Sequence, residues 1–183
     1  MSRGSPDPMR LPAGAEIRRA RPEDAEAVAR VHVAGWRHAY RGLLPDDYLD
    51  GLDWRDRVER HRASLSDGPD AVSTFVAVLD GRLVGFAAHG PSRDDDLPQG
   101  RPVQEVYAIY LVQEALGRGI GSALLRRCLA AAPPDATVTL WVLGDNARGR
   151  RFYERHGFVA DGATKTYAVA GRELPEVRYR LDR

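Results

Sequence analysis

The segment that most constrains this chain spans residues 105–129, where a β-prone run, a glycine-rich turn and a helical run follow one another directly. Residues 106–112 are apolar, and the turn after them carries Gly117, Gly119 and Gly121. A strand that leads through such a turn into a helix gathers free backbone N–H groups and the positive end of the helix dipole at one point. Glycine has no Cβ, so the backbone can approach a ligand closely. The segment therefore predicts an anion site, with phosphate as the expected anion.

Two common phosphate-binding loops do not fit this turn. The Walker loop requires Gly-Lys-Ser/Thr at its glycines, whereas the single lysine of this chain is Lys165, far downstream. A dinucleotide-binding turn requires Gly-x-Gly-x-x-Gly and an acidic strand end about 20 residues later. The spacing from Gly117 to Gly121 differs, and no such strand end follows. The turn therefore indicates a different class of phosphate site.

Length, charge and cysteine content exclude several classes of protein. A chain of 183 residues has the size of one ordinary domain and can bury a core without metals or disulfides. The single cysteine, Cys128, excludes a disulfide framework, and its helical spacing with Leu124 and Ile120 favours a buried thiol over a nucleophile. A net charge of +1 provides no electrostatic footprint for nucleic acid or an anionic membrane. Without a membrane-spanning apolar run or a signal-like start, a cytoplasmic location is expected.

The residue pattern predicts one domain after a short tail. Residues 1–15 are rich in proline, glycine and serine and are expected to form a disordered tail, and residues 16–183 are expected to form the domain. Strand-like and helical runs follow one another in it without an internal repeat or a linker. The expected strands are 16–20, 72–79, 82–89, 106–112, 137–143, 159–168 and 174–181, and the expected helices are 22–40, 46–52, 54–64, 122–129 and 147–156.

Two motifs resemble those of the GCN5-related N-acetyltransferase (GNAT) superfamily. The glycine turn resembles the family's pyrophosphate loop, Gln/Arg-x-x-Gly-x-Gly/Ala, with Gly119 and Gly121 at the glycine positions and Leu116 where Gln or Arg is usual. Residues 146–158 resemble the family's Asn-x-x-Ala-x-x-Phe-Tyr-x-x-x-Gly-Phe segment, with Gly149 in place of alanine. The resemblance covers the chain after the tail. It implies a single-domain α/β GNAT fold, with a mixed central sheet of about six to seven strands, a splayed parallel pair and about four flanking helices.

The resemblance also implies acetyl-CoA as the co-substrate, and no metal. In the family the pantetheine arm pairs with the strand before the phosphate loop, and here that strand supplies the backbone of Tyr110, Leu111 and Val112. An amide near Leu111 would face the thioester oxygen, and one such oxyanion donor can be worth roughly 3 kcal/mol of barrier. Backbone amides of the turn would hold the pyrophosphate. The expected cofactor-binding residues are Tyr110, Leu111, Val112, Leu116, Gly117, Arg118, Gly119, Ile120, Gly121, Ser122, Ala123, Asn146, Phe152 and Tyr153.

Two of these side chains have a second interpretation. Arg118 is expected either to bind a CoA phosphate through a charge-assisted contact or to remain a solvated loop arginine. Asn146 is expected to contact the pantetheine amides, as in the family, or only to cap the helix that follows. The sequence alone leaves both alternatives open.

The resemblance implies that Tyr153 is the general acid that protonates the CoA sulfur. A phenol with an ordinary pKa near 10 stays protonated at pH 7 and can still reach a thiolate of comparable basicity. The alternative is that Tyr153 is a packing aromatic beside Phe152 on a short helix. The motif favours the acid role.

Glu105 is the expected general base, acting on the amine directly or through water. Many members of the family carry a carboxylate at the start of the central strand. The alternatives are an exposed strand-end carboxylate without a catalytic role and a substitute base, His89, at the end of the preceding strand. Because side chains alternate along a strand, Glu105, Tyr107 and Ile109 are expected to share one face.

Trp36, Tyr40 and Tyr107 are the expected acceptor-binding residues. Trp36 and Tyr40 are four positions apart and meet on one helical face, where they either line the acceptor pocket or belong to the core. Residues 36–45 resemble the segment that covers the acceptor pocket in small-molecule and amino-acid acetyltransferases of the family. Residues 94–96, three aspartates in a row, would attract a cationic amine or are only solvated.

The expected function is transfer of an acetyl group from acetyl-CoA to a primary amine of a small molecule or amino acid, by direct attack in a ternary complex. A covalent acetyl-enzyme is not favoured, because the one cysteine is expected inside a helix. One alternative is a protein N-terminal or lysine acetyltransferase, which would need an open groove. The other is a catalytically inactive acetyl-CoA-binding regulatory module. A homodimer is possible by analogy with the family, and neither nucleic acid nor a membrane is an expected partner.

Overall fold

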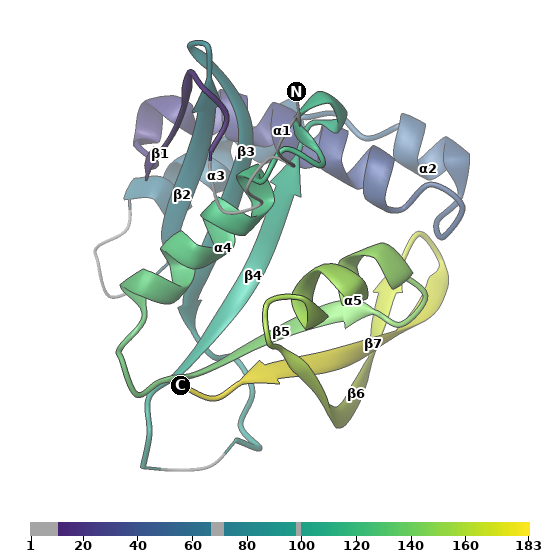
Figure 1. The fold of residues 1–183 in the computed structure, drawn as a ribbon. Helices are drawn as coiled ribbons and strands as arrows, with labels where there is room; N and C mark the ends of the chain where they lie inside the picture. The colour runs from purple at the N-terminus through teal and green to yellow at the C-terminus, as the bar shows by residue number, and fades with distance from the viewer. Residues whose placement is uncertain (1–10, 67–71, 98–99) are drawn as a thin grey trace, which may run out of the picture.

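The fold is built around one mixed sheet, seen in a computed structural model that describes residues 11–66, 72–97 and 100–183 (Figure 1). Seven strands lie in the order β1-β2-β3-β4-β5-β7-β6, and the pair β4–β5 is parallel whereas the other neighbours are antiparallel. The strands are β1 (Ala15–Arg19), β2 (Ser73–Leu79), β3 (Arg82–Pro91), β4 (Val103–Leu111), β5 (Thr137–Leu143), β6 (Val159–Val169) and β7 (Arg172–Leu181). The expected mixed sheet of about six to seven strands is confirmed.

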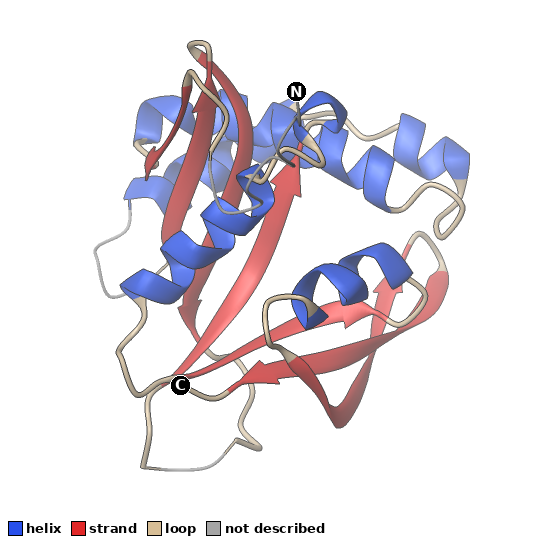
Figure 2. Cartoon of the chain, in the orientation of Figure 1, coloured by secondary structure: helices blue, strands red, loops and turns tan. Residues whose placement is uncertain are grey.

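Helices cover both faces of this sheet (Figure 2). Helix α4 packs on β2, β3 and β4 from one face, and α1 packs on β3 and β4 from the other, with α3 against α1. The α-helices are α1 (Ala25–Ala39), α2 (Asp46–Asp50), α3 (Arg55–Ser66), α4 (Ile120–Ala131) and α5 (Ala147–Glu154), and two 3-10 turns are η1 (Pro22–Asp24) and η2 (Gln113–Ala115). Each expected helix is present in the described residues, and the buried leucines of α4 supply part of the main core.

The predicted tail falls mostly outside the described residues, which begin at Leu11. Leu11 packs against the main core, and the backbone carbonyl of Gly14 accepts a hydrogen bond of 3.1 Å from the N–H of Asp80. Strand β1 then begins at Ala15. Disorder of residues 1–10 stays a prediction.

Strands β4 and β5 diverge soon after they meet. Their parallel ladder covers Val103–Glu105 against Thr137–Thr139, and Figure 1 shows the two strands separating beyond it. From there β5 continues along β7, whereas β4 stays with β3 up to Leu111. The later half of β4 therefore has one edge without a strand partner among the described residues, which confirms the expected splayed pair.

A β-bulge interrupts the alternation of side chains in β4. His89 of β3 lies opposite Val106, but the next residue back, Ala88, lies opposite Ala108, so Tyr107 is the extra residue. After the bulge, Ile109 packs into the core under α4 together with Val106. The expectation that Glu105, Tyr107 and Ile109 share a face is therefore wrong for Ile109, because the bulge shifts the register between them.

Candidate active site

The glycine turn has the backbone geometry that an anion site needs. Gly117 and Gly119 adopt φ angles of +72° and +77°, which strain any residue with a Cβ. Gly119 is the N-cap of α4, and the first backbone bond of the helix runs from Ala123 N to Gly119 O at 3.0 Å. The N–H groups before that bond have no acceptor within a helix and lie at the positive end of its dipole. This end of α4 fits the pyrophosphate of acetyl-CoA.

The remaining residues of the turn are either packed against neighbouring elements or exposed to solvent. A Cβ on Gly121 would lie 3.5 Å from both Leu111 and Phe152, so Gly121 lets β4, α4 and α5 approach one another. Leu116 is half-buried, and its N–H bonds to Gln113 O at 3.1 Å. Leucine at this position, where the family motif has Gln or Arg, therefore lacks a polar side chain but leaves the backbone turn in place. Arg118 is exposed, which is compatible with both of its expected roles.

The open edge of β4 presents the backbone of Leu111. The N–H of Val112 already bonds to Val84 O of β3 at 2.9 Å. Backbone groups of successive strand residues point to opposite edges, so Leu111 and Ile109 direct theirs to the edge that β5 leaves free. Of the three expected backbone partners of pantetheine, Leu111 has the matching direction. Tyr110 and Val112 direct their N–H groups toward β3.

Asn146 caps α5 with its side-chain oxygen, which accepts a hydrogen bond of 2.9 Å from Gly149 N. A Cβ on Gly149 would lie 2.9–3.2 Å from the Asn146 side chain, so glycine suits this close cap. The cap confirms one of the two expected roles of Asn146. Its contact with pantetheine stays a prediction.

Tyr153 is half-buried on α5 and packs against the main core. Its ring makes T-shaped contacts with Phe152 and Phe158, at centroid distances of 5.1 and 5.9 Å. Burial raises the pKa of Tyr153 above its ordinary value, and the nearby phenol of Tyr40 raises it further. The phenol therefore stays protonated at neutral pH, as the acid role requires.

Tyr40, at the end of α1, contacts Tyr110 of β4 on the sheet face that α1 covers. Their hydroxyl oxygens lie 2.9 Å apart, and burial raises the pKa of both phenols. Tyr40 also packs edge-on against Trp36 at 5.0 Å, and Trp36 is 9% exposed. Helix α1 and β4 thus bring two predicted site residues, Tyr40 and Tyr110, into direct contact close to Tyr153.

A match to a family model identifies the protein family to which this arrangement belongs. The model of the acetyltransferase (GNAT) family matches residues 33–158, which include the glycine turn and α5. The chain belongs to the GNAT family. Membership makes it an acetyl-CoA-dependent N-acetyltransferase, which confirms the expectation from its two motifs.

Individual GNAT relatives cover nearly all of the chain. The probable N-acetyltransferase Rv2775 of Mycobacterium tuberculosis is 33% identical over 177 residues, which are 94% of this chain and 96% of that protein. The L-amino acid N-acetyltransferase AaaT of Escherichia coli is 28% identical over 166 residues, 89% of this chain and 94% of that protein. The structure of PaiA N-acetyltransferase from Thermoplasma acidophilum in complex with coenzyme A has a TM-score of 0.60 at 20% identity, covering 91% of this chain and 98% of that one. It shares the GNAT fold.

Glu105 of this GNAT protein is buried and held by one partner. It is 1% exposed, and its Oε2 accepts bonds from the backbone N and the Nε of Arg93 at 3.1 and 3.0 Å. Arg93 also binds Oε1 and lies 4.6 Å from the centre of the Tyr107 ring. The exposed strand-end alternative is therefore wrong. The base role of Glu105 stays a prediction, and its geometry is that of an anchor for Arg93.

His89 faces the other side of the sheet. Its ring stacks on Phe75 at 5.9 Å, within the core under α4, and burial lowers its pKa. Tyr40 and Tyr110 lie on the α1 face. The position of His89 therefore favours a structural role over that of a substitute base.

The acidic run before β4 is neutralised from β7. Arg178, which is 5% exposed, binds Asp96 at 2.6 and 2.9 Å and lies 3.4 Å from Asp94. Asp94 also accepts a hydrogen bond from the indole N–H of Trp141. Two of the three aspartates thus form part of an ion-pair network that ties this loop to β5 and β7. Neither the free acidic rim nor the purely solvated run describes them.

Sequence reasoning missed the residues that β6 and β7 contribute on the α1 side. Glu176 of β7 is half-buried, lies 3.7 Å from Lys165 Nζ, and has a pKa raised by burial. Tyr167 of β6 contacts the Trp36 ring at 6.5 Å. From the sequence these strands are expected only to form a closing hairpin. The spacing of two between Leu174 and Glu176 was the available signal that both side chains lie on one face.

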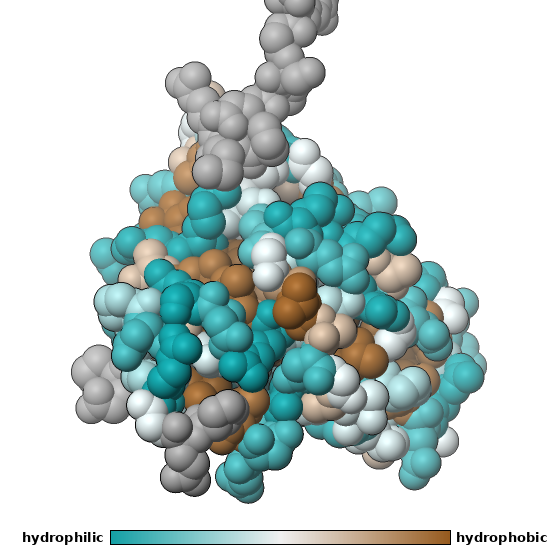
Figure 3. Space-filling view, turned by 60° about the horizontal axis from the view of Figure 1, so that its bottom comes forward, coloured by the Kyte–Doolittle hydropathy of each residue, from teal (hydrophilic) through white to brown (hydrophobic). Residues whose placement is uncertain are grey.

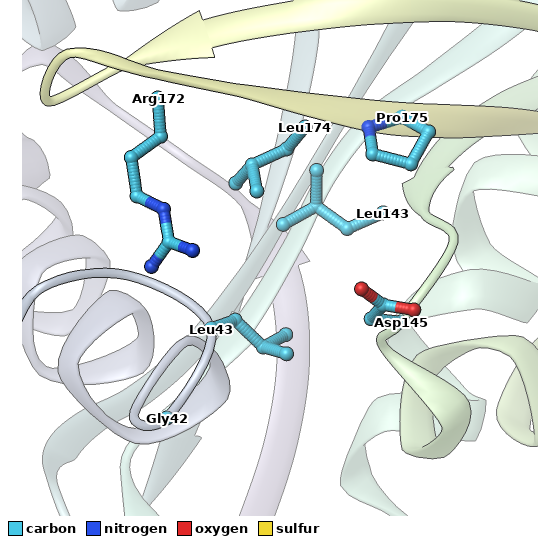
Figure 4. Close-up of a pocket in the computed structure, with 7 residues that line it drawn as sticks. All are labelled: Gly42, Leu43, Leu143, Asp145, Arg172, Leu174 and Pro175. Carbon is cyan, nitrogen blue, oxygen red and sulfur yellow. The ribbon is translucent and has the colours of Figure 1, made fainter.

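A hollow of about 110 Å³ lies beside these residues (Figure 4). It joins the α1–α2 loop to the ends of β5 and β7. In Figure 4 the guanidinium of Arg172 points toward the loop at Gly42, and the carboxylate of Asp145 lies across from it. The lining residues are Gly42, Leu43, Leu143, Asp145, Arg172, Leu174 and Pro175.

Among the described residues, no group of three His, Cys, Asp or Glu side chains is arranged to hold a metal ion. The same part of the chain contains no helix with the length and apolar character needed to cross a membrane.

Proposed function

We propose that this GNAT protein transfers an acetyl group from acetyl-CoA to the primary amine of a small molecule, such as an amino acid, by direct attack in a ternary complex. The observation that carries the proposal is the Tyr40–Tyr110 hydroxyl pair next to the open edge of β4, within electrostatic reach of the Tyr153 phenol. Acetyl-CoA supplies the activated acetyl group. The domain of residues 16–183 supplies the remaining functions.

The residues have separate roles in this proposal. The turn from Gly117 to Ala123 binds the pyrophosphate through backbone N–H groups, and Phe152 packs against the turn at Gly121. The N–H of Leu111 stabilises the negative charge that develops on the thioester oxygen. Tyr153 gives its phenolic proton to the leaving sulfur. Trp36, Tyr40 and Tyr107 line the route of the acceptor.

Direct attack is supported by the state of the one cysteine. Cys128 is 1% exposed, and burial raises its pKa to about 12. The thiolate is the nucleophilic form of cysteine. A thiol that stays protonated inside α4 is therefore unsuited to carry an acetyl group.

A small acceptor is supported by the α1 side of the site. The hollow of about 110 Å³ has room for a small molecule, and Leu43 and Leu174 face it from opposite elements. The relative from Escherichia coli is named as an L-amino acid N-acetyltransferase. A protein N-terminus or lysine would require an open groove at this place. The inactive regulatory module is disfavoured because Tyr153 is retained in the family motif.

The proposal also includes that the protein forms a homodimer and acts in the cytoplasm. The face drawn in Figure 3 is largely hydrophilic, with apolar residues in separate patches. The dimer rests on analogy with the family, and the mass of the protein in solution can be measured by light scattering. A monomer at micromolar concentration would contradict it.

The test of the proposed function is calorimetric titration with acetyl-CoA, followed by release of the CoA thiol in the presence of the twenty L-amino acids and benzylamine. We expect binding that requires the pyrophosphate, so pantetheine alone should bind far more weakly. We also expect thiol release with at least one amine. Folded protein that does not bind acetyl-CoA would contradict the cofactor site, and binding without release would contradict the small-amine acceptor.

A further inference from the structure

Glu176 occupies a defined place on the α1 side of β7. It lies opposite Leu143 of β5 and opposite Lys165 of β6 in the strand register. Because side chains alternate, Glu176 shares a face with Leu174, which packs against the cluster around Trp36. The carboxylate is therefore directed toward α1, the side from which an acceptor would approach β4.

Two carboxylates near this site differ in their capacity to bind another cation. Glu105 is enclosed, because Arg93 binds both of its oxygens. Glu176 has one cation, the Lys165 Nζ, at 3.7 Å from Oε2, which is beyond a good hydrogen-bond distance. Among the described residues, the second oxygen of Glu176 accepts no hydrogen bond. Its side chain is 16% exposed, so it is largely desolvated but still reachable.

The ammonium group of Lys165 shows which chemistry this place accommodates. Lys165 Nζ lies 4.0 Å from the centre of the Trp141 ring and 3.7 Å from the Glu176 carboxylate. An aromatic face together with a carboxylate is a favourable environment for an alkylammonium ion. The Lys165 side chain is 41% exposed and can move aside at little cost.

The titratable and charged groups around Glu176 come from β4, β6, the loop after β3 and the C-terminal cap of α1. Burial raises its pKa, and the charge of Glu105 also raises it, whereas Lys165 and Arg93 lower it. Its charge in turn raises the pKa values of Tyr40 and Tyr167. Glu176 thus lies within electrostatic reach of Tyr40, whose hydroxyl contacts Tyr110 on β4.

We propose that Glu176 binds the ammonium group of the acceptor and removes one proton from it, and this rests on the proposed function. An amine arrives at neutral pH mostly as the ammonium ion, which cannot attack. One proton passes from nitrogen to a carboxylate oxygen of Glu176 and then to water. The neutral nitrogen forms the C–N bond with the acetyl carbon, the C–S bond breaks, and its electron pair goes to sulfur. Tyr153 protonates the sulfur and recovers a proton from the nitrogen, so one proton is released in total.

The test compares Glu176→Gln with Glu173→Gln, a matched control on the same strand whose side chain is exposed. Thiol release is measured from pH 5 to 9 with the twenty L-amino acids and benzylamine, and acetyl-CoA affinity by calorimetry. We expect Glu176→Gln to lower kcat/KM for the amine at least ~100-fold, the lower end of general base effects. Acetyl-CoA affinity should stay within about twofold in both variants, which also reports folding. Glu176→Asp should recover part of the activity, and the acidic limb of the pH profile should disappear in Glu176→Gln.

Each result decides the inference. If Glu176→Gln retains kcat/KM within about threefold of the natural protein, the inference is overturned while the proposed function stands. If the natural protein binds acetyl-CoA but releases thiol with none of these amines, the small-amine proposal fails. Binding of benzylamine to the CoA complex, followed by tryptophan fluorescence, then decides the role of Glu176. A loss of about tenfold or more in Glu176→Gln supports it, and equal binding or no binding overturns it.

Discussion

The hydroxyl oxygens of Tyr40 and Tyr110 lie 2.9 Å apart and connect the end of α1 to β4 at its open edge. His32, about two turns earlier on α1, stacks on the Tyr110 ring with centroids 5.2 Å apart. Gly35 between them lets the helix approach, since a Cβ there would lie 2.8 Å from Tyr110 Cβ. The proposed acceptor side is thus held by close packing between one helix and one strand, and this packing can be tested directly.

Replacing Tyr40 with Phe should lower the free energy of unfolding by about 1 kcal/mol, because the half-buried hydroxyl of Tyr110 loses its partner. Urea denaturation of Tyr40→Phe, Tyr110→Phe and the double variant measures the coupling. We expect the double variant to lose less than the sum of the single ones. Tyr48→Phe is the control and should change stability by less than about 0.5 kcal/mol. Additive losses would show that the two hydroxyls do not interact.

Replacing Gly35 with Ala tests the approach of α1 to β4. Helix propensity alone predicts a gain of about 1 kcal/mol for Gly→Ala. The added Cβ would lie 2.8 and 3.0 Å from Tyr110 Cβ and Cδ1, so we expect a net loss of about 1–3 kcal/mol instead. Thermal unfolding followed by circular dichroism gives the sign. A more stable Gly35→Ala variant would mean that the helix moves away easily.

The cofactor side of the site could be predicted from the sequence because its determinants are local. The turn from Gly117 to Gly121 connects a strand directly to a helix, and Asn146 caps the helix that carries Tyr153 only a few residues later. Short-range patterns of this kind determine both the backbone conformation and the direction of the backbone N–H groups. The direction of Tyr110 was missed, because which edge a residue faces depends on its pairing with β3.

The contacts around the proposed acceptor side could not be predicted, because they join distant parts of the chain. Arg93 reaches Glu105 across a loop, and Arg178 reaches Asp96 from the last strand. Both arginines look like ordinary surface residues in the sequence. The bulge at Tyr107 changes the facing of the residues after it, and no local signal marks its place. Ion pairs between residues so far apart in the sequence can be identified only when the strand register is known.

Replacing Tyr153 with Phe removes the proposed acid without removing the ring. We expect kcat to fall at least ~100-fold, in the range of general acid effects, while acetyl-CoA affinity changes less than about twofold. Thiol release and calorimetry on the same preparation measure both quantities. The control is Tyr48→Phe, since Tyr48 belongs to α2 and is not among the residues assigned to the cofactor or the acceptor. A normal kcat in Tyr153→Phe would assign the residue to packing alone.

Replacing Arg178 with Met should destabilise the domain by about 3 kcal/mol, because Asp94 and Asp161 would remain largely buried without their cation. The matched control is Arg180→Met, whose ion pair with Asp182 is more exposed and should contribute less than about 1 kcal/mol. Guanidinium denaturation of the two variants compares them. Equal losses would show that burial does not distinguish the two arginines.

The pair formed by His32 and His61 should make stability depend on pH. His32 Nδ1 lies 3.0 Å from His61 Nε2, and burial, with the charges of Arg57 and Arg60, lowers their pKa values to about 3 and about 4. Below a pH of about 6.5 the unfolded chain binds protons that the folded pair rejects, so stability is complete above this pH and falls as the pH drops toward 4. His32→Phe keeps the ring stacked on Tyr110 and removes one titrating group. Urea denaturation at pH 4.5, 5.5, 6.5 and 7.5 should therefore show a slope smaller by up to about 1.4 kcal/mol per pH unit, and an unchanged slope would place the acid sensitivity elsewhere.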